Sequence, residues 1–489
     1  MNPLSRITAL ALIAGSASAL ADTTENPEKS SDLLRFTNHD TLHGRFIGFG
    51  ASDTLIWNNP EATGAINFST SKLHRVVLNQ GKAHLALKQT SHVKLTNGDV
   101  IPGKIISADS KTVVMETDHL GKLEIPRSAL SKIAPSPFGG KLLYHGPLNK
   151  EGWKTLPTAT KDGVKKAEPK DDDEKASSDW QHISSAWYVG TDKSRFLVRE
   201  NAMPDKCQIS FQLTWRSSLY AQVALHADFS PPEYEGKVSS QLEMGATIGH
   251  GYILNLSNHS ASLTECTFDE NGKPTNTRLQ GSQSSLGLSS VETAHVELRL
   301  DKKQKNILFF LNGDFKAKWD LGKDYAGKGA HFAIKSQDYR KSEIRISDIV
   351  ISHWNGRKDS ASSMQSNDRD LILLTNGLDR FSGTFKGLHE GKVSFRGSYQ
   401  NDMLIPLDEI NEITLSSGKE EKTVTENPQA VYFYIHPHGR ITGIPGQTID
   451  NLTKIETALL GEITLDTRYT NIIDFSHKNS LFDNWDDNF

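Results

Sequence analysis

The chain has 489 residues, 36% of them hydrophobic and 23% charged, which excludes a disordered chain and indicates roughly three domains of ordinary size. Its 55 lysines and arginines nearly balance its 59 aspartates and glutamates, so the chain lacks the basic excess of a nucleic-acid binder. Two cysteines are too few for a disulfide-dense scaffold or a four-thiolate zinc site.

Residues 1–21 have the pattern of a secretory signal peptide. Arg6 precedes a short apolar run, and Ala19 and Ala21 supply the small residues of a cleavage site. The alternative, a buried N-terminal helix, is disfavoured by the polar stretch after Asp22. No later window has the roughly 18 apolar residues of a transmembrane helix. We therefore expect an exported protein, periplasmic or at the cell surface, that does not span a membrane.

The segments 32–90 and 91–137 are predicted to be two copies of one small β unit. In each copy a strand meets a tight turn, a second strand carries a glycine near its middle, and an apolar pair closes the unit about 30 residues later. A glycine at the bend of a strand is typical of a small closed barrel, and the units resemble SH3-like or Sm-like barrels. The glycines are Gly44 and Gly103, and the closing pairs are Leu73/Val76 and Leu130/Ile133.

The segment 139–356 alternates with the period of two that half-buried strands require. Clear examples are the runs 209–215, 296–300 and 344–347, and Asn312-Gly313 predicts a type I′ hairpin turn. Within it, residues 161–178 mix both charges and have no large apolar side chain other than Val164, so they predict a disordered charged insertion.

The start of this segment carries a resemblance to a known family. Leu142-Leu143 and Gly146, followed by Gly152-Trp153, resemble the opening of concanavalin/laminin-G-like jelly rolls of the 3-keto-disaccharide hydrolase type. The resemblance implies a central jelly-roll sandwich. That fold serves lectins, hydrolases and structural modules alike, so it does not by itself assign an activity.

Cys207 and Cys266 have two interpretations in an exported protein. A bridge would close a loop of about 60 residues and is worth roughly 4 kcal/mol on the chain-entropy model. The alternative is two separate buried thiols. We expect the bridge, although the sequence does not show whether the two side chains face each other.

Signatures of catalysis are missing from the sequence. Glucanases of this fold class carry closely spaced carboxylates on one strand face, and no such set is present. The glycine-rich segment 245–251 is interpreted as a flexible loop, because no helix is expected after it to bind a phosphate. His436-Pro437-His438 is interpreted as a turn, since no third metal ligand has a suitable spacing. We predict no catalytic residue, no metal and no cofactor.

A sugar-binding groove needs aromatic faces together with planar polar groups. Such residues occur on strands expected to line the sandwich, with the alternative that Trp215 and Tyr252 belong to the core. The candidates are Trp215, Arg216, Tyr220, His226, Asp228, Tyr252 and Asn255.

After a predicted linker at 357–369, the β unit recurs twice, at 370–418 and 428–489. The equivalent features are Gly383 with Ile410/Ile413, and Gly443 with Tyr469/Ile472. Units this small are marginal alone, so we expect neighbours in the chain to pack together, one pair on each side of the sandwich: 32–90 with 91–137, and 370–418 with 428–489. Phe482 and Trp485 in the acidic C-terminal tail are expected to pack on the last unit.

These features predict an exported, non-catalytic binding or scaffold protein whose jelly roll contacts a polysaccharide or a surface protein, with no nucleic-acid partner. Two alternatives stay open. One is a glycoside or keto-sugar hydrolase acting through the jelly-roll groove, which the resemblance permits. The other is a cell-surface assembly component, suggested by the acidic, aromatic C-terminus.

Overall fold

The structure is a computed structural model. It describes residues 32–476 apart from 52, 82, 138–140, 158–179, 184, 191–194, 323, 337–342, 357–367, 377–378, 398–401, 417–426 and 428. Strands dominate the described residues and pair antiparallel, which confirms the all-β prediction. The predicted signal peptide, the charged insertion 161–178, nearly all of the linker 357–369 and the C-terminal residues from 477 lie outside the described residues. No helix among the described residues has the length and apolar character needed to cross a membrane.

Four five-stranded units form around the four repeated segments, and we number them 1 to 4 in chain order. In each unit the fourth strand pairs with the third, the third with the second, the second with the first, and the first with the fifth. In unit 2 the second strand is split into β7 and β8. The strands of units 1 and 2 are β1 (Asp32–Phe36), β2 (Thr41–Phe49), β3 (Thr54–Asn58), β4 (Ile66–Ser69), β5 (Leu73–Val77), β6 (His92–Leu95), β7 (Val100–Pro102), β8 (Lys104–Ala108), β9 (Thr112–Thr117), β10 (Gly121–Pro126) and β11 (Leu130–Ala134).

Units 3 and 4 have the same order. Their strands are β28 (Asp370–Leu374), β29 (Arg380–His389), β30 (Lys392–Gly397), β31 (Asp402–Pro406), β32 (Ile410–Thr414), β33 (Val431–Ile435), β34 (Arg440–Ile449), β35 (Leu452–Thr457), β36 (Gly461–Asp466) and β37 (Thr470–Asp474). A short 3-10 turn precedes the fifth strand of every unit: η1 (Thr70–Lys72), η3 (Arg127–Ala129), η7 (Leu407–Glu409) and η8 (Thr467–Tyr469). The likeness of the units to SH3-like or Sm-like barrels stays a prediction.

The repeated glycine allows the second strand to cross its neighbours closely. A Cβ on Gly383 would lie 2.0 Å from the carbonyl oxygen of Arg396, and a Cβ on Gly443 would lie 2.4 Å from the Ile455 side chain. Two residues later the pairing register shifts in all four units, which marks a β-bulge. A bulge bends a strand and increases its twist, so glycine and bulge together curl the sheet of each unit.

The expected pairing of neighbouring units is wrong. The fifth strand of unit 1 pairs with the fifth strand of unit 4, bringing Val76 opposite Ile473, and the fifth strand of unit 2 pairs with that of unit 3, bringing Ile133 opposite Ile413. Each sequence repeat ends in an edge strand that needs a partner, but the repeats do not specify which of the equivalent edges supplies it.

This register also corrects one alignment. Phe433 pairs with Ile473 as Leu34 pairs with Val76, so the closing apolar residue of unit 4 is Ile473 rather than Ile472. The other residue of this closing pair is Thr470 rather than Tyr469, because Tyr469 lies in the turn η8.

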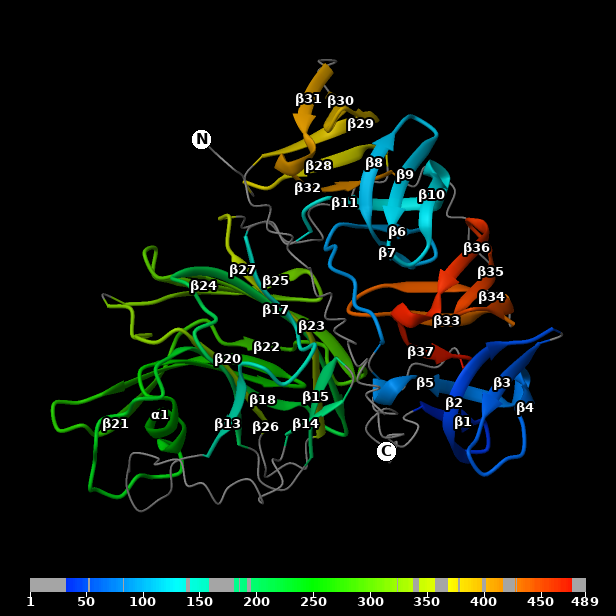
Figure 1. Cartoon of the computed structure of the whole chain (residues 1–489). Helices are drawn as coiled ribbons and strands as arrows, with labels where there is room; N and C mark the ends of the chain where they lie inside the picture. The colour runs from blue at the N-terminus through cyan, green and yellow to red at the C-terminus, as the bar shows by residue number, and fades with distance from the viewer. Residues whose placement is uncertain are drawn as a thin grey trace, which may run out of the picture.

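The four units form one row, in the order 3, 2, 4, 1 (Figure 1). Units 2 and 4 meet where Val100 pairs with Arg440. Asp99 of unit 2 is 3% exposed and accepts hydrogen bonds from the Arg440 side chain and from the backbone and hydroxyl of Thr442. One continuous apolar cluster contains residues of every unit, such as Leu34, Val93, Ile372 and Phe433.

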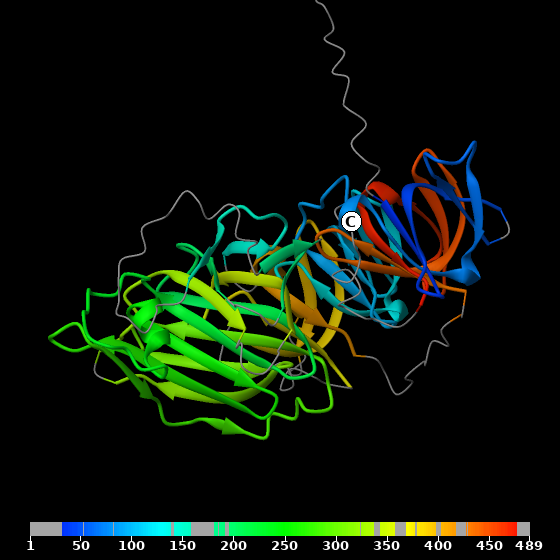
Figure 2. The same ribbon diagram turned by 90° about the horizontal axis from the view of Figure 1, so that it is seen from below.

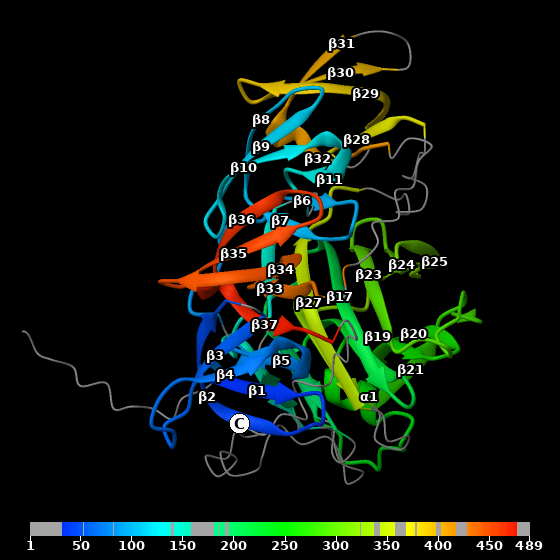
Figure 3. The same cartoon turned by 90° about the vertical axis from the view of Figure 1, so that its right-hand side faces the viewer.

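The sandwich lies beside this row (Figure 2). One of its sheets has the strand order β14-β15-β27-β17-β23-β24-β25, with β12 paired to β27; the other has the order β13-β16-β26-β18-β19-β20-β21, with β22 paired to β20. Strands β17 and β27 of the first sheet lie near the units in Figure 3, so we call it the row-facing sheet and the second the outer sheet. This two-sheet architecture is the one that the jelly-roll resemblance implied.

The row-facing sheet contains β12 (Leu142–Gly146), β14 (Trp180–Ile183), β15 (Ala186–Val189), β17 (Lys206–Arg216), β23 (Thr293–Asp301), β24 (Asn306–Leu311), β25 (Asp314–Asp320) and β27 (Glu343–His353). The outer sheet contains β13 (Trp153–Leu156), β16 (Phe196–Arg199), β18 (Tyr220–Ala227), β19 (Gly251–Ser257), β20 (Ser260–Phe268), β21 (Pro274–Arg278), β22 (Gln283–Ser284) and β26 (His331–Ser336). An apolar core fills the space between the two sheets.

Two local predictions have different outcomes. Asn312 and Gly313 have φ values of 52° and 83° in the turn between β24 and β25, which confirms the type I′ hairpin. The glycine-rich segment is not a flexible loop: it contains the short helix α1 (Glu243–Ile248), which ends at Gly249. Its inner residues are buried, among them Ala246 and Ile248, and this burial offsets the low helix propensity of the sequence.

Candidate functional site

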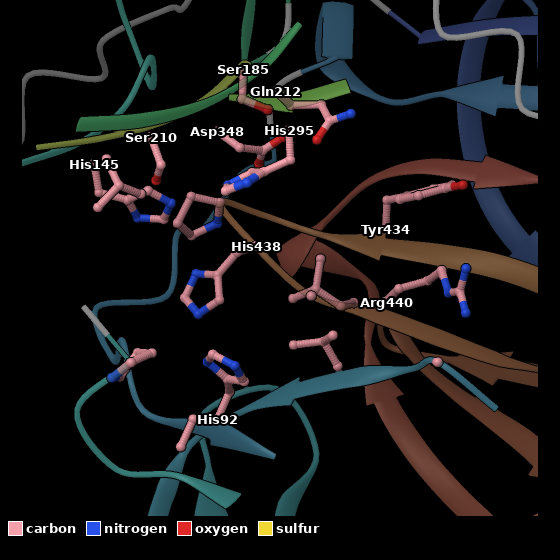
Figure 4. Close-up of a pocket in the computed structure, with 18 of the residues that line it drawn as sticks. His92, His145, Ser185, Ser210, Gln212, His295, Asp348, Tyr434, His438 and Arg440 are labelled. Atoms are coloured by element: carbon pink, nitrogen blue, oxygen red, sulfur yellow. The ribbon is translucent and has the colours of Figure 1, made fainter. Parts of the chain in front are cut away.

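A cleft of about 810 Å³ lies between the row-facing sheet and the units 2 and 4 (Figure 4). The period-two alternation of β17 builds one wall, because Ile209, Phe211 and Leu213 point into the core and the polar residues between them point out. The cleft-facing residues of the sandwich include Gln208, Ser210, Gln212, Thr293, His295, Glu297, Arg345 and Asp348.

The strand register sets these polar groups side by side. Gln212 lies opposite His295, and Ser210 lies opposite Glu297. The amide nitrogen of Gln212 donates to the hydroxyl of Thr293 on the neighbouring strand. The result is an array of amide, hydroxyl, imidazole and carboxylate groups on one rigid sheet face.

Unit 4 supplies much of the opposite wall, from the end of β33 and the turn that follows it. Tyr434, His438 and Arg440 line the cleft. The guanidinium of Arg440 lies 4.9 Å from the centre of the Tyr432 ring and donates to Asp99 at 3.1 Å, so its position is fixed by contacts with both units.

The formal charges of the cleft cancel. Four cationic side chains face it, and so do four carboxylates: Arg75, Lys132, Arg345 and Arg440, against Glu297, Asp348, Glu412 and Asp474. Lys132 and Glu412 are also an ion pair at 2.9 Å. A balanced site lacks the single-sign field that would concentrate a polyanion or a polycation.

Three histidines converge at one end of the cleft, and we call them the histidine cluster: His92, His145 and His438. The ring centre of His438 lies 5.4 Å from that of His145 and 6.1 Å from that of His92. Both ring nitrogens of His438 are buried without a hydrogen-bond partner among the described residues. Burial, reinforced by the neighbouring His145 and His92, lowers the pKa of His438 to about 3, so all its contacts at neutral pH are those of an uncharged ring. No group of three or more His, Cys, Asp or Glu in the described part of the chain has a geometry that would hold a metal ion.

Three of the predicted ligand-binding residues belong to the interior. Trp215 is 1% exposed, and Tyr252 and His226 are fully buried, so the core alternative describes the two aromatic residues. His226 contacts the hydroxyl of Tyr325 at 2.6 Å and the carbonyl of Pro204 at 3.1 Å, and burial lowers its pKa to about 4. It ties loops of the sandwich together rather than facing a ligand.

The other four candidates do not form one group: Tyr220 and Asn255 lie on neighbouring strands of the outer sheet, and Arg216 and Asp228 lie elsewhere. Arg216 lies 3.6 Å from Glu343 at the end of β17. Asn255, on the outer sheet, accepts a hydrogen bond from Gln222, and Tyr220 is on the neighbouring strand β18. Asp228 lies 2.9 Å from the His250 ring in a loop beside α1. Nothing tests the sugar-binding role of these residues, which stays a prediction.

The expected disulfide is wrong, because both cysteines are free and buried. Cys207 is in the core between the sheets, whereas Cys266 belongs to a separate apolar cluster with Phe196 and Ile253. The alternative of two separate thiols is therefore the one the structure contains. Burial raises the pKa of both thiols, that of Cys266 to about 12.

Sequence reasoning missed the cleft because its walls come from segments that are distant in the chain. One signal was present: the outward positions of β17 read Gln-Ser-Gln, an uncharged polar series unlike the charged face expected of a strand in water. His436-Pro437-His438 does form the predicted turn, between β33 and β34. Its placement against the sandwich was not predictable from spacing.

Comparisons with known proteins describe the fold only. No family model and no curated protein is similar enough in sequence to match the chain. Part of the chain is similar to a carbohydrate-binding module from Bacillus subtilis (9% identity, 41% of this chain and 95% of that one, TM-score 0.26). It is also similar to a Bacillus subtilis protein of unknown function with a galectin-like fold (12%, 44% and 96%, TM-score 0.29). A third is the exoplasmic/lumenal domain of VIP36 in its Ca²⁺/Man3GlcNAc-bound form (10%, 46% and 92%, TM-score 0.29).

Proposed function

We propose that this protein is an exported, non-catalytic glycan-binding protein whose ligand lies in the cleft between the row-facing sheet and units 2 and 4. The observation that supports this proposal best is the chemistry of the cleft walls: planar amides and hydroxyls on one side, and Tyr434 with a fixed guanidinium on the other. Export is supported by the sequence pattern of residues 1–21.

The size of the cleft agrees with an oligosaccharide. Small-molecule sites commonly enclose about 300–1,000 Å³, and the cleft has about 810 Å³. Hydroxyl groups of a sugar both donate and accept hydrogen bonds, so they can satisfy the amide of Gln212, the ring of His295 and the carboxylate of Glu297 at once. A charged ligand would leave half of the charged groups facing a like charge.

The four row units then act as the second wall of the site and as a scaffold. Unit 4 contributes the turn 436–439 and unit 2 contributes β6, both of which lie against the sandwich. In this arrangement the row covers the row-facing sheet, which carries the amides, and does not cover the outer sheet.

The test is a screen of the full chain on immobilised polysaccharides, followed by calorimetric titration of the retained sugar. We expect Gln212→Ala and Tyr434→Ala each to weaken binding about tenfold, the effect of about 1.4 kcal/mol. Asn255→Ala tests the rival candidate on the outer sheet, which this proposal does not use, and it should leave the affinity unchanged. The proposal is wrong if Asn255→Ala abolishes binding while Gln212→Ala does not, or if no polysaccharide is retained. Cleavage of the retained sugar would instead favour the hydrolase alternative.

A further inference from the structure

We propose that the histidine cluster is an acid-sensitive latch: its neutral rings hold the sandwich against units 2 and 4, and their protonation separates the two and releases the ligand. This inference rests on the proposed function only for the ligand; the opening itself does not depend on it.

The cluster joins three parts of the chain that are distant in sequence. His145 lies on β12 of the sandwich, His92 on β6 of unit 2, and His438 in the turn between β33 and β34 of unit 4. Figure 4 shows the three rings around one end of the cleft, with His438 between the other two. Any movement of the sandwich away from the row must therefore separate the ring of His145 from that of His438.

The surroundings of the cluster do not compensate a positive charge well. Of the two nearby carboxylates, Glu412 is paired with Lys132 at 2.9 Å. The other, Asp348, favours protonation of His145, but the cost of burying the charged ring is larger and the pKa of His145 is lowered overall. The other charged or titratable groups that act on these histidines are cationic or are themselves histidines: Lys94 and His119 from unit 2, and His436 from unit 4.

The direction of the pH effect follows from these pKa values. Burial lowers the pKa of His92 and His145, and that of His438 falls to about 3. A ring that is exposed by opening returns towards its ordinary value of about 6.5. The open form therefore binds more protons than the closed form below pH 6.5. The closed form has its full stability above that pH and loses stability as the pH falls.

A non-titrating contact crosses the same junction. The side-chain amide of Asn355, at the end of the sandwich, donates to the carbonyl oxygen of Thr375 in unit 3 at 2.8 Å. Since neither group titrates near neutral pH, acid leaves this contact in place while it weakens the histidine contacts. The sandwich is then expected to rotate about the contact between Asn355 and Thr375. This rotation opens the cleft at the histidine cluster.

Small-angle X-ray scattering of the full chain at pH 7.5 and pH 5.0 tests the opening without any ligand. The wild type should have a larger radius of gyration at pH 5.0, and the change should reverse on return to pH 7.5. His438→Gln and His92→Gln, tested singly and together, should remove most of the change, because glutamine keeps polarity but cannot be protonated. The matched control is His389→Gln, an exposed histidine on β29, which should open as the wild type does.

Two scattering results would overturn the latch: an unchanged radius of the wild type over this pH range, or an unreduced change in both single variants. Near-ultraviolet circular dichroism at pH 7.5 confirms that each variant is folded, and two independent sites keep the test decisive if one variant is not.

The ligand is tested separately, with the polysaccharide retained at pH 7.5. We expect the affinity of the wild type to fall at least about tenfold at pH 5.0, and that of the double variant to fall less than about threefold. A wild type that opens but binds no sugar at either pH contradicts the proposed function and not the latch. A sugar that binds equally at both pH values contradicts the latch and not the proposed function.

Discussion

Buried carboxylates fix the first strand of two of the units. Asp370 is 2% exposed and accepts hydrogen bonds from the Phe385 and Ser416 backbones at 2.7 and 2.8 Å, and from Arg127 of the neighbouring unit at 2.8 Å. Asp32 occupies the equivalent position in unit 1 and accepts from the Phe46 and Asn79 backbones. Each carboxylate thus connects the first strand of its unit to the second strand and to the segment just after the fifth strand.

We predict that Asp370→Asn lowers the free energy of unfolding by about 3 kcal/mol, because the amide cannot accept all these bonds and Arg127 loses its partner. The matched control is Asp402→Asn, which breaks an exposed pair with Arg396 and should leave the free energy of unfolding nearly unchanged. Urea unfolding of the full chain, followed by fluorescence, measures both. Equal effects of the two substitutions would show that the buried carboxylate has no special role.

A second prediction at this scale concerns the thiols. Because Cys207 and Cys266 are buried and their pKa values are raised, the native protein should react with Ellman's reagent much more slowly than the unfolded protein. In denaturant without reductant, both thiols should react. If no thiol reacts under those conditions, the two cysteines form the disulfide that the structure lacks.

At the scale of the element, the fifth strands join unit 1 to unit 4 and unit 2 to unit 3. Each is an edge of its own unit, and pairing two such edges satisfies their backbone groups and buries the apolar residue at the centre. Ile413 is 1% exposed in this position, opposite Ile133 of unit 2. The curl produced by the glycine and the bulge of the second strand leaves these edges accessible to each other.

We predict that Ile413→Ala costs about 3 kcal/mol of stability, as expected for a large-to-small change in a packed core. Ile106→Ala is the matched control, since Ile106 is 43% exposed on β8 and should cost no more than about 0.5 kcal/mol. Urea midpoints of the two variants give the comparison. If Ile413→Ala is as mild as the control, the strand pair between units 2 and 3 does not contribute to the stability of the row.

At the scale of the whole molecule, the two ends of the chain are interleaved in one row. Units 1 and 2 precede the sandwich and units 3 and 4 follow it, yet unit 1 pairs with unit 4 and unit 2 with unit 3. The shared apolar cluster makes the row a single folding unit rather than two pairs. The sandwich is therefore inserted into a scaffold that holds it from both of its ends.

This arrangement predicts that the two fragments of a cleaved chain remain associated. With a specific protease site introduced at 357–367, the cleaved protein should still elute as one particle in gel filtration, because both strand pairs and the cluster join the fragments. Denaturant should then separate them. Fragments that part in native buffer after cleavage would contradict the interleaved row.

Much of the fold was predictable from local pattern. Alternation located strands such as β17 and β23, Asn312-Gly313 located a hairpin, and the spacing after Gly103 and Gly383 located the repeated unit. These features depend on a few neighbouring residues. The choice of partner for each edge strand depends on contacts hundreds of residues apart, such as Val76 with Ile473, and has no local signature.

The site was less predictable for the same reason. Aromatic residues such as Trp215 and Tyr252 attract attention in a sequence, but their large apolar area makes them core residues here. The cleft is lined by polar side chains of ordinary size, among them Gln212, His295 and His438. What these residues have in common is that they line the same surface of the folded chain.

The central claim is that a ligand lies between the row-facing sheet and unit 4. The most direct test is hydrogen–deuterium exchange of the full chain with and without the retained polysaccharide. We expect the sugar to slow exchange in β17 and in the turn 436–439, and to leave β19 and β20 of the outer sheet unchanged. Protection of β19 and β20 instead, with none in β17 and the turn, would contradict it.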